Sequence, residues 1–128
     1  MAYTAPTDDI LYSEGGPIFS LQANGAIYAG QCLTAYGTME CDQAANDDDA
    51  FIGVAQYTVA DNGYVSVIGP GNVVRCIVSG TSKCDVGDDM YCAGTEGKVA
   101  NAGTAANKIG VALETQSTAD GTARILLV

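Results

Sequence analysis

The sequence predicts an all-β protein, a compact small β-barrel or sandwich built from two similar halves. Three observations favour this fold class. Apolar residues do not keep a helical i, i+3, i+4 spacing over about eleven residues or more, because glycines interrupt nearly every window. Short β-rich segments alternate with turn residues along the chain. The tetrapeptide Ile-Gly-Val-Ala occurs twice, 57 residues apart, with similar glycines and turns around each copy.

The clearest strand signals lie in the middle of the chain. Segment 51–59 is rich in β-branched and apolar residues, and segment 64–68 places two valines on one face, as a strand does. Segment 73–78 follows a Gly-Pro-Gly turn and ends before a serine and a glycine. These three segments are therefore predicted strands.

Two dipeptides mark hairpin turns. Asn62-Gly63 lies between two of the predicted strands, and Asp120-Gly121 precedes the last apolar run of the chain. Such dipeptides are typical of type I′ turns, whose central residues have positive φ. We therefore expect positive φ at Gly63 and at Gly121.

The internal repeat divides a single β domain, residues 17–128, into two halves at about 17–70 and 73–128. Ile-Gly-Val-Ala at 52–55 recurs at 109–112, and each copy follows a glycine-rich loop and precedes a hairpin signal. A glycine inside a strand indicates a β-bulge or the close approach of another backbone, as at the corner of a barrel. The two halves are expected to share one core that contains Ile52, Val54, Ile109 and Val111.

Residues 1–16 lie outside the repeat and are interpreted as an extended N-terminal arm that the core does not need. The arm contains the apolar run Ile10-Leu11-Tyr12 and ends at Gly15-Gly16, a natural hinge. Exposed apolar residues in a row favour an arm that orders on a partner. Its predicted anchors are Tyr3, Ile10, Leu11 and Tyr12. The alternative is a frayed terminus.

Charge and composition exclude several functions. The chain has 15 acidic residues, five basic residues and no histidine, for a net charge of −10. Without histidine it has no Ser-His-Asp triad, no Cys-His pair and no imidazole ligand for a metal. Phosphate contacts need Lys and Arg, so nucleic acid is not an expected partner. Residues 1–74 hold nine acids and no base; this asymmetry either serves solubility or gives an acidic face that meets a basic partner.

Neither a signal peptide nor a membrane partner is expected. The N-terminus has no basic region followed by an apolar one, and the apolar runs are too short to span a bilayer. The five cysteines are odd in number and contain no Cys-x-x-Cys pair, which argues against zinc. We expect five buried, reduced thiols that behave as small hydrophobic residues. The alternative is one or two disulfides formed outside a cell.

The remaining chemistry would have to come from acidic residues. Asp47, Asp48 and Asp49 form a run that is interpreted as a solvated turn, although a weak calcium site and a small hydrolase are the competing hypotheses for it. The Gly-Pro-Gly turn lacks the Lys-Ser/Thr of a phosphate loop. No nucleophile, base and oxyanion hole can be assembled from the sequence. The prediction is a non-enzyme with no cofactor, no metal and no small-molecule substrate.

The order of glycine-based strands and turns resembles the capsid decoration, or cement, proteins of tailed bacteriophages and related archaeal viruses. The resemblance covers about residues 17–128. It rests on the segments 29–33, 51–55, 61–63, 65–67, 73–80, 86–91, 97–99, 109–114 and 119–127.

The resemblance implies a structural virion protein that is made in the host cytoplasm and binds the outer surface of an icosahedral capsid. It implies that the chain stabilises the head, usually as a homotrimer, with the major capsid protein as its partner. The alternative from another class is a carbohydrate- or surface-binding β-module of a tail fibre or a cell surface. That module would need exposed aromatic platforms, and the seven tyrosines are scattered along the sequence.

Overall fold

The computed structural model describes residues 10–44, 50–79, 84–92, 96–102, 108–117 and 121–128. These residues form eleven strands in two sets and contain no helix, which confirms the predicted all-β class. One set is a closed barrel, the first barrel, in the order β2-β4-β3-β5-β6. Its strands are β2 (Ile18–Ala23), β3 (Cys32–Ala35), β4 (Glu40–Gln43), β5 (Phe51–Ala55) and β6 (Tyr64–Ile68).

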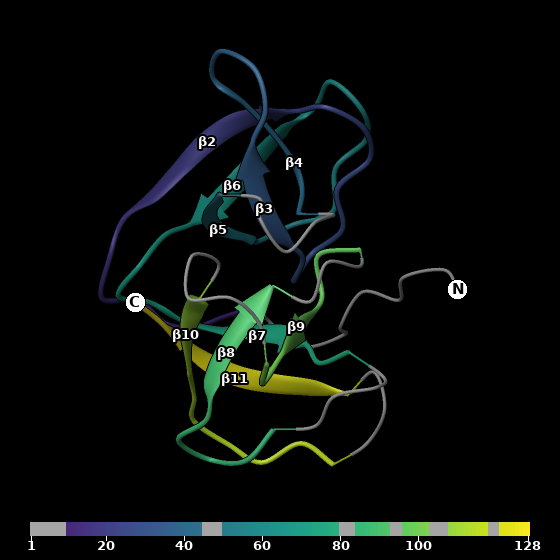
Figure 1. Cartoon of the computed structure of the whole chain (residues 1–128). Helices are drawn as coiled ribbons and strands as arrows, with labels where there is room; N and C mark the ends of the chain where they lie inside the picture. The colour runs from purple at the N-terminus through teal and green to yellow at the C-terminus, as the bar shows by residue number, and fades with distance from the viewer. Residues whose placement is uncertain (1–9, 45–49, 80–83, 93–95, 103–107, 118–120) are drawn as a thin grey trace.

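The other set is a six-stranded sheet, the second sheet, in the order β1-β7-β11-β10-β8-β9. In Figure 1 it lies below the first barrel, and β5 and β10 face each other between the two. Its strands are β1 (Leu11–Ser13), β7 (Val73–Ile77), β8 (Asp89–Cys92), β9 (Val99–Ala100), β10 (Lys108–Ala112) and β11 (Thr122–Leu127).

The sequence repeat is a repeat of connectivity. In the first barrel the parallel pair β2–β4 closes the ring, with Ala23 opposite Cys41. In the second sheet the parallel bridge between Val78 and Val99 joins β7 to β9 at the same point of the order. The second sheet therefore follows the path of the first barrel, with β1 added at its edge.

Backbone hydrogen bonds repeat with the strands. Gly30 N–H donates to the Ala55 carbonyl at 2.8 Å, and Gly87 N–H donates to the Ala112 carbonyl at 2.8 Å. Both glycines have positive φ, 87° and 91°. A residue with a side chain would be strained there, so the same turn geometry explains why glycine precedes a strand in each half.

The two interiors are built from equivalent positions. The interior of the first barrel consists of small and β-branched side chains: Leu21, Ala23, Ile27, Leu33, Cys41, Ala55, Val65 and Val67. Each has a buried counterpart in the second sheet: Cys76, Val78, Cys84, Met90, Val99, Ala112, Ala123 and Ile125. Two different sets of volumes thus fill the same arrangement of strands.

The glycine inside each Ile-Gly-Val-Ala strand marks a bulge, as predicted. The register between β3 and β5 shifts near Gly53, and the register between β10 and β8 shifts near Gly110. A Cβ atom on Gly53 would clash with the Ile68 carbonyl, and one on Gly110 would clash with the Leu126 carbonyl. The neighbouring strand can approach only because both positions lack a side chain.

The shared core is smaller than the sequence predicts. Val54 and Ile109 are fully buried in one cluster that joins the first barrel to the second sheet. Ile52 is instead partly buried against the barrel interior. Val111 is half-buried on the outer face of β10.

The hairpin prediction is wrong in its detail. The turn after β5 closes with a hydrogen bond from Gly63 N–H to the Ala60 carbonyl at 2.9 Å, but Asn62 takes the positive φ, 68°. Asparagine tolerates this conformation because its short side chain hydrogen-bonds locally. Gly121 does not have positive φ either, and its turn partners at 118–120 lie outside the described residues.

Residues 10–16, which the sequence assigns to the arm, lie against the second sheet. Ile10 is buried, and its carbonyl accepts a hydrogen bond from Arg75 N–H at 2.8 Å. The buried amide of Asn72 accepts hydrogen bonds from Gly15 N–H at 2.9 Å and Gly16 N–H at 3.1 Å. Strand β1 and this amide therefore fasten the segment to β7 and to the turn before it.

Candidate functional site

The structure places the predicted contact residues differently from one another. Ile10 is 4% exposed and belongs to the core, Leu11 is half-buried against it, and Tyr12 is 57% exposed. Tyr3 lies outside the described residues. Of the three side chains that the structure describes, Tyr12 is therefore the one that presents a surface to a partner.

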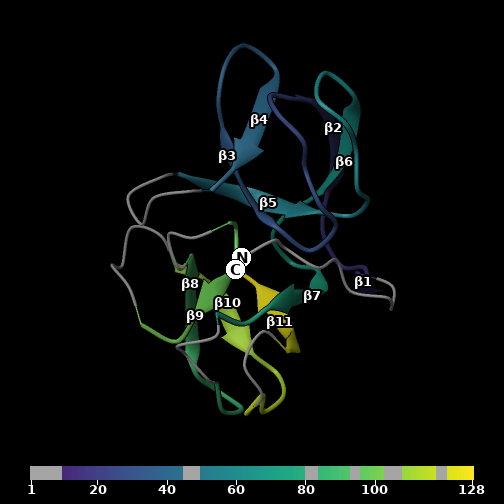
Figure 2. The same ribbon diagram turned by 90° about the vertical axis from the view of Figure 1, so that its right-hand side faces the viewer.

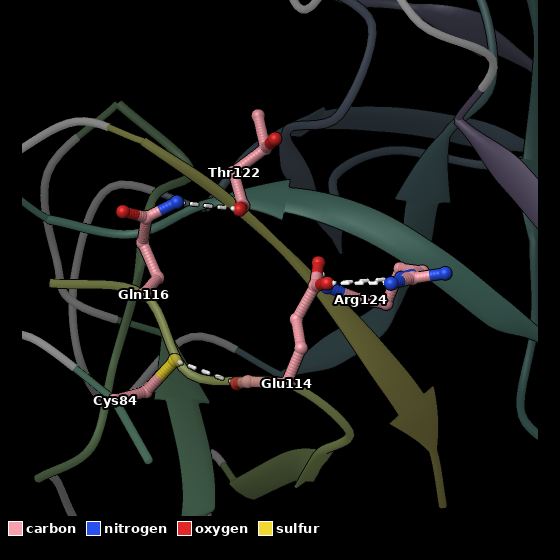
Figure 3. A network of polar contacts seen from close by, with 5 residues as sticks. All are labelled: Cys84, Glu114, Gln116, Thr122 and Arg124. Atoms are coloured by element: carbon pink, nitrogen blue, oxygen red, sulfur yellow. Dashed lines mark hydrogen bonds and ion pairs between the residues drawn. The ribbon is translucent and has the colours of Figure 1, made fainter. Parts of the chain in front are cut away.

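A polar cluster that the sequence did not indicate lies beside Tyr12. The Arg124 guanidinium lies over the Tyr12 ring, 4.7 Å from its centroid. Glu114 Oε2 accepts hydrogen bonds from Arg124 Nη2 at 2.7 Å and Nε at 3.1 Å, and Oε1 accepts one from the Arg124 backbone N–H at 2.8 Å. Figure 3 shows this pair bridging the connection between β10 and β11.

Neighbouring contacts hold the same connection. Gln116 Nε2 donates to the Thr122 carbonyl at 2.8 Å, and the Cys84 thiol donates to the Glu114 carbonyl at 3.6 Å (Figure 3). Hydrogen bonds from Arg124 lower the pKa of the Glu114 carboxyl, and the same contacts raise the pKa of Arg124. The carboxylate is held ionised at neutral pH, so the cluster fixes a loop and offers no proton for acid catalysis.

Two other acidic residues of the second sheet, Asp88 and Asp89, also have structural partners. Asp88 accepts a hydrogen bond from Asp85 N–H at 2.9 Å, and Asp89 pairs with Lys108 at 3.1 Å. Asp47, Asp48 and Asp49, which carry the calcium and hydrolase hypotheses, lie outside the described residues. Within the described ranges no group of three or more potential metal ligands comes together. In the same part of the chain, no helix is long and apolar enough to cross a membrane.

All five cysteine side chains are buried, which confirms that part of the prediction. Cys32 of the first barrel meets Cys76 and Cys92 of the second sheet, and thiol hydrogen bonds with these two hold the pKa of Cys32 well above its ordinary value. Burial raises the pKa of Cys41 to about 11. Thiols with raised pKa values are poor nucleophiles, so these residues act as small core side chains.

A second exposed surface lies at the outer end of the first barrel. Its main side chains are Tyr36 (63% exposed) and Met39 (69%) from the β3–β4 turn and Tyr64 (72%) from the start of β6. Figures 1 and 2 both place the β3–β4 turn at the end of the barrel that points away from the second sheet. The sequence did not single out these residues, because only the barrel closure brings them together.

The fold and these surfaces define an all-β protein in which two halves repeat one five-stranded connectivity and present exposed aromatic side chains. Among solved structures, the chain is similar to the head fibre gp8.5 N base of bacteriophage phi29. The similarity covers 88% of this chain and 93% of that chain, with a TM-score of 0.66 and 20% sequence identity. It shows a shared fold. No protein-family model matches the sequence, and no curated protein matches it either.

Proposed function

We propose that this chain is a structural phage virion protein that attaches to the outer surface of the capsid and stabilises it as a decoration, or cement, protein. The observation that carries the proposal is the structural match, along nearly the whole of both chains, to the base of a phage head fibre. Because function resides in surfaces rather than in a fold, the exposed side chains of Tyr36, Met39 and Tyr64 at the outer end of the first barrel are the second support.

The proposed partner is the major capsid protein, and the proposed role involves no catalysis, cofactor or small-molecule substrate. The chain would be made in the host cytoplasm and end on the virion surface. The polar groups around Glu114 support a non-catalytic role because each is used to hold a loop. A rigid β structure with two filled interiors suits a protein that must brace its neighbours without changing shape.

A homotrimer at threefold positions of the head is the proposed assembly. An icosahedral lattice repeats each contact many times, so small interfaces can sum to strong attachment. Sedimentation equilibrium of the purified chain tests this step directly. A molecular mass three times that of the 13.0 kDa chain is expected, and a monomer at all concentrations would contradict a trimer formed in solution.

The test of the function uses heads of the encoding phage assembled without this chain. Purified chain is added, and the heads are imaged by cryo-electron microscopy. We expect additional density on the outer surface at symmetry-related sites, and a higher temperature of genome release from the decorated heads. Heads that stay bare at saturating protein would contradict attachment. Decoration without any change in release temperature would contradict the stabilising role alone.

Exposed tyrosines on the first barrel favour one other function, a carbohydrate-binding β-module. Tyr57 and Tyr64 are 61% and 72% exposed, and flat exposed rings are the platforms on which such a module binds sugars. A glycan array separates the two functions. Specific glycan binding that disappears in Tyr64→Ser would favour the carbohydrate function, whereas binding to bare heads without glycan binding favours the capsid.

A further inference from the structure

Three neighbouring strands build one surface at the outer end of the first barrel. On β2, Gln22 pairs with Glu40 of β4 on one side and with Tyr64 of β6 on the other. Gln22 N–H also donates to the Met39 carbonyl at 3.1 Å, and Tyr36 N–H donates to the Glu40 carbonyl at 3.0 Å. Backbone pairing thus places Glu40, Gln22 and Tyr64 in one row across the sheet, with Tyr36 and Met39 in the turn next to Glu40. We call Tyr36, Met39 and Tyr64 the distal patch.

Met39 has a backbone conformation that is unfavourable for methionine. Its φ is 57°, in the left-handed region that favours glycine and asparagine. Its side chain is 69% exposed, so it gains little from the barrel core. The fold therefore bears some strain to present a flexible apolar side chain in the β3–β4 turn. Methionine and tyrosine are both enriched in protein interfaces.

The charge around the distal patch has one sign. The first half, residues 17–70, contains six acidic residues and no Lys or Arg. Glu40 lies in the patch itself, with its carboxylate against Gly37, and Asp61 lies in the β5–β6 turn, where Oδ1 accepts from Gly25 N–H at 2.7 Å. Within the described residues, both ion pairs belong to the second sheet, Lys108–Asp89 and Arg124–Glu114.

This pattern selects the kind of partner. A nucleic acid or an anionic membrane would be repelled by the carboxylates of Glu40 and Asp61, which form no ion pair within the described residues. A second copy of the chain is a poor match, because few cations of the second sheet are available to it among the described residues. Lys108 and Arg124 are in ion pairs, the charge of Arg75 lowers the pKa of Glu114, and Lys98 is 5% exposed. A protein surface that supplies its own Lys or Arg beside apolar groups is complementary to the patch.

We propose that the distal patch is a docking surface for a basic surface of another protein. The inference rests on the proposed function, under which that protein is the capsid shell protein. Tyr36, Met39 and Tyr64 supply the apolar contact, and Glu40 and Asp61 supply the field that attracts and orients the partner. The second sheet, which holds the two ion pairs of the described residues, then faces away from the capsid.

The test measures binding of the full-length chain to heads of the encoding phage assembled without it. Bound protein is quantified after sedimentation over a range of concentrations. The double variant Tyr36→Ser/Tyr64→Ser is expected to need about tenfold more protein for half-saturation, because both exposed rings are lost. Tyr12→Ser, which removes a similarly exposed ring from the second sheet, tests the competing surface beside Arg124 and should bind like the wild type only if the distal patch is the docking surface. Val86→Ser is the control, since Val86 is 66% exposed outside the patch.

Charge is tested separately with salt and with Glu40→Gln. Raising the salt concentration from about 50 to 500 mM should weaken binding severalfold, because it screens exposed charges. Glu40→Gln should weaken binding at low salt, whereas the control Asp89→Asn should not. Binding that does not respond to salt or to Glu40→Gln would overturn the basic partner.

The outcomes separate this inference from the function on which it rests. Wild-type protein that does not bind bare heads overturns both. Wild-type binding that the double variant retains in full overturns the distal patch alone and leaves capsid attachment standing. Loss of binding in Tyr12→Ser with normal binding in the double variant also overturns it, and would assign docking to the second sheet. Apart from the half-buried Glu40, these variants change exposed side chains, and an unchanged melting temperature confirms that each is folded.

Discussion

The first barrel and the second sheet have the same strand connectivity but different side chains and charges. The first barrel closes through a two-residue parallel pair, whereas the second sheet closes through a single bridge and has β1 added at its edge. The first barrel has acidic side chains and no Lys or Arg, whereas the second sheet holds the ion pairs Lys108–Asp89 and Arg124–Glu114. Equivalent glycines allow the bulge in both. Backbone requirements at a few positions therefore determine the connectivity, whereas the side chains on the outer surfaces differ between the two halves.

The largest expected effect comes from filling either bulge. Gly110→Val should destabilise the protein by about 3 kcal/mol or more, because its Cβ would meet the Leu126 carbonyl and a backbone strand cannot move aside cheaply. Gly53→Val should cost a similar amount if the two bulges are equivalent. Urea unfolding monitored by circular dichroism measures both. A Gly110→Val protein as stable as the wild type would remove the equivalence of the halves.

Removal of residues 1–16 is expected to destabilise the second sheet and leave the first barrel intact. The deletion takes away the buried side chain of Ile10, worth about 1.5–3 kcal/mol, and exposes the edge of β7. It also leaves the buried Asn72 carbonyl oxygen without its two backbone donors. Hydrogen exchange should show lost protection in β7 and β11 and retained protection in β2 and β6. Uniform protection after deletion would show that these residues are the dispensable arm that the sequence suggested.

The ion pair Glu114–Arg124 makes the second sheet sensitive to acid. The pKa of Glu114 is lower in the folded protein than in the unfolded chain, so its contribution is complete above the unfolded value near 4.3 and disappears as pH falls through the folded value. The pair is partly exposed, so its contribution to stability is expected to be small. Melting temperatures between pH 6 and pH 3 should fall less steeply in Glu114→Gln. Parallel curves would show that the pair adds nothing.

The smallest expected effect is a gain. Met39→Asn should stabilise the first barrel by about 0.5 kcal/mol, because asparagine adopts positive φ with less strain. Differential scanning calorimetry of the variant and of the exposed control Val86→Asn measures the difference. A lower melting temperature in Met39→Asn would show that the methionine side chain supports the turn.

The sequence predicted the fold where a backbone requirement leaves a visible residue. Gly53 and Gly110 indicated the bulges, and the repeat around them indicated two halves. It failed where two residues can satisfy one requirement, as when Asn62 rather than Gly63 took the positive φ. A three-residue strand such as β1 has no period of its own, so Ile10 looked like an exposed anchor although it is buried.

The candidate surfaces could not be predicted from the sequence because they form only when distant strands pair and loops fold back. Tyr64 and the turn that holds Tyr36 come to the same end of the barrel through β2, which pairs with β4 in parallel and with β6 in antiparallel orientation. Glu114 and Arg124 are ten residues apart and face each other only when the β10–β11 connection folds back. No local pattern in the sequence encodes either approach.

The cysteines between the first barrel and the second sheet can report how often the two halves separate. Cys32 belongs to the first barrel, and the two thiols that it meets belong to the second sheet, so a reagent in solution cannot reach any of the three while the halves are together. Their rate of modification by a soluble disulfide reagent should therefore report how often the halves separate. A slow rate would show that the first barrel and the second sheet stay joined as one unit.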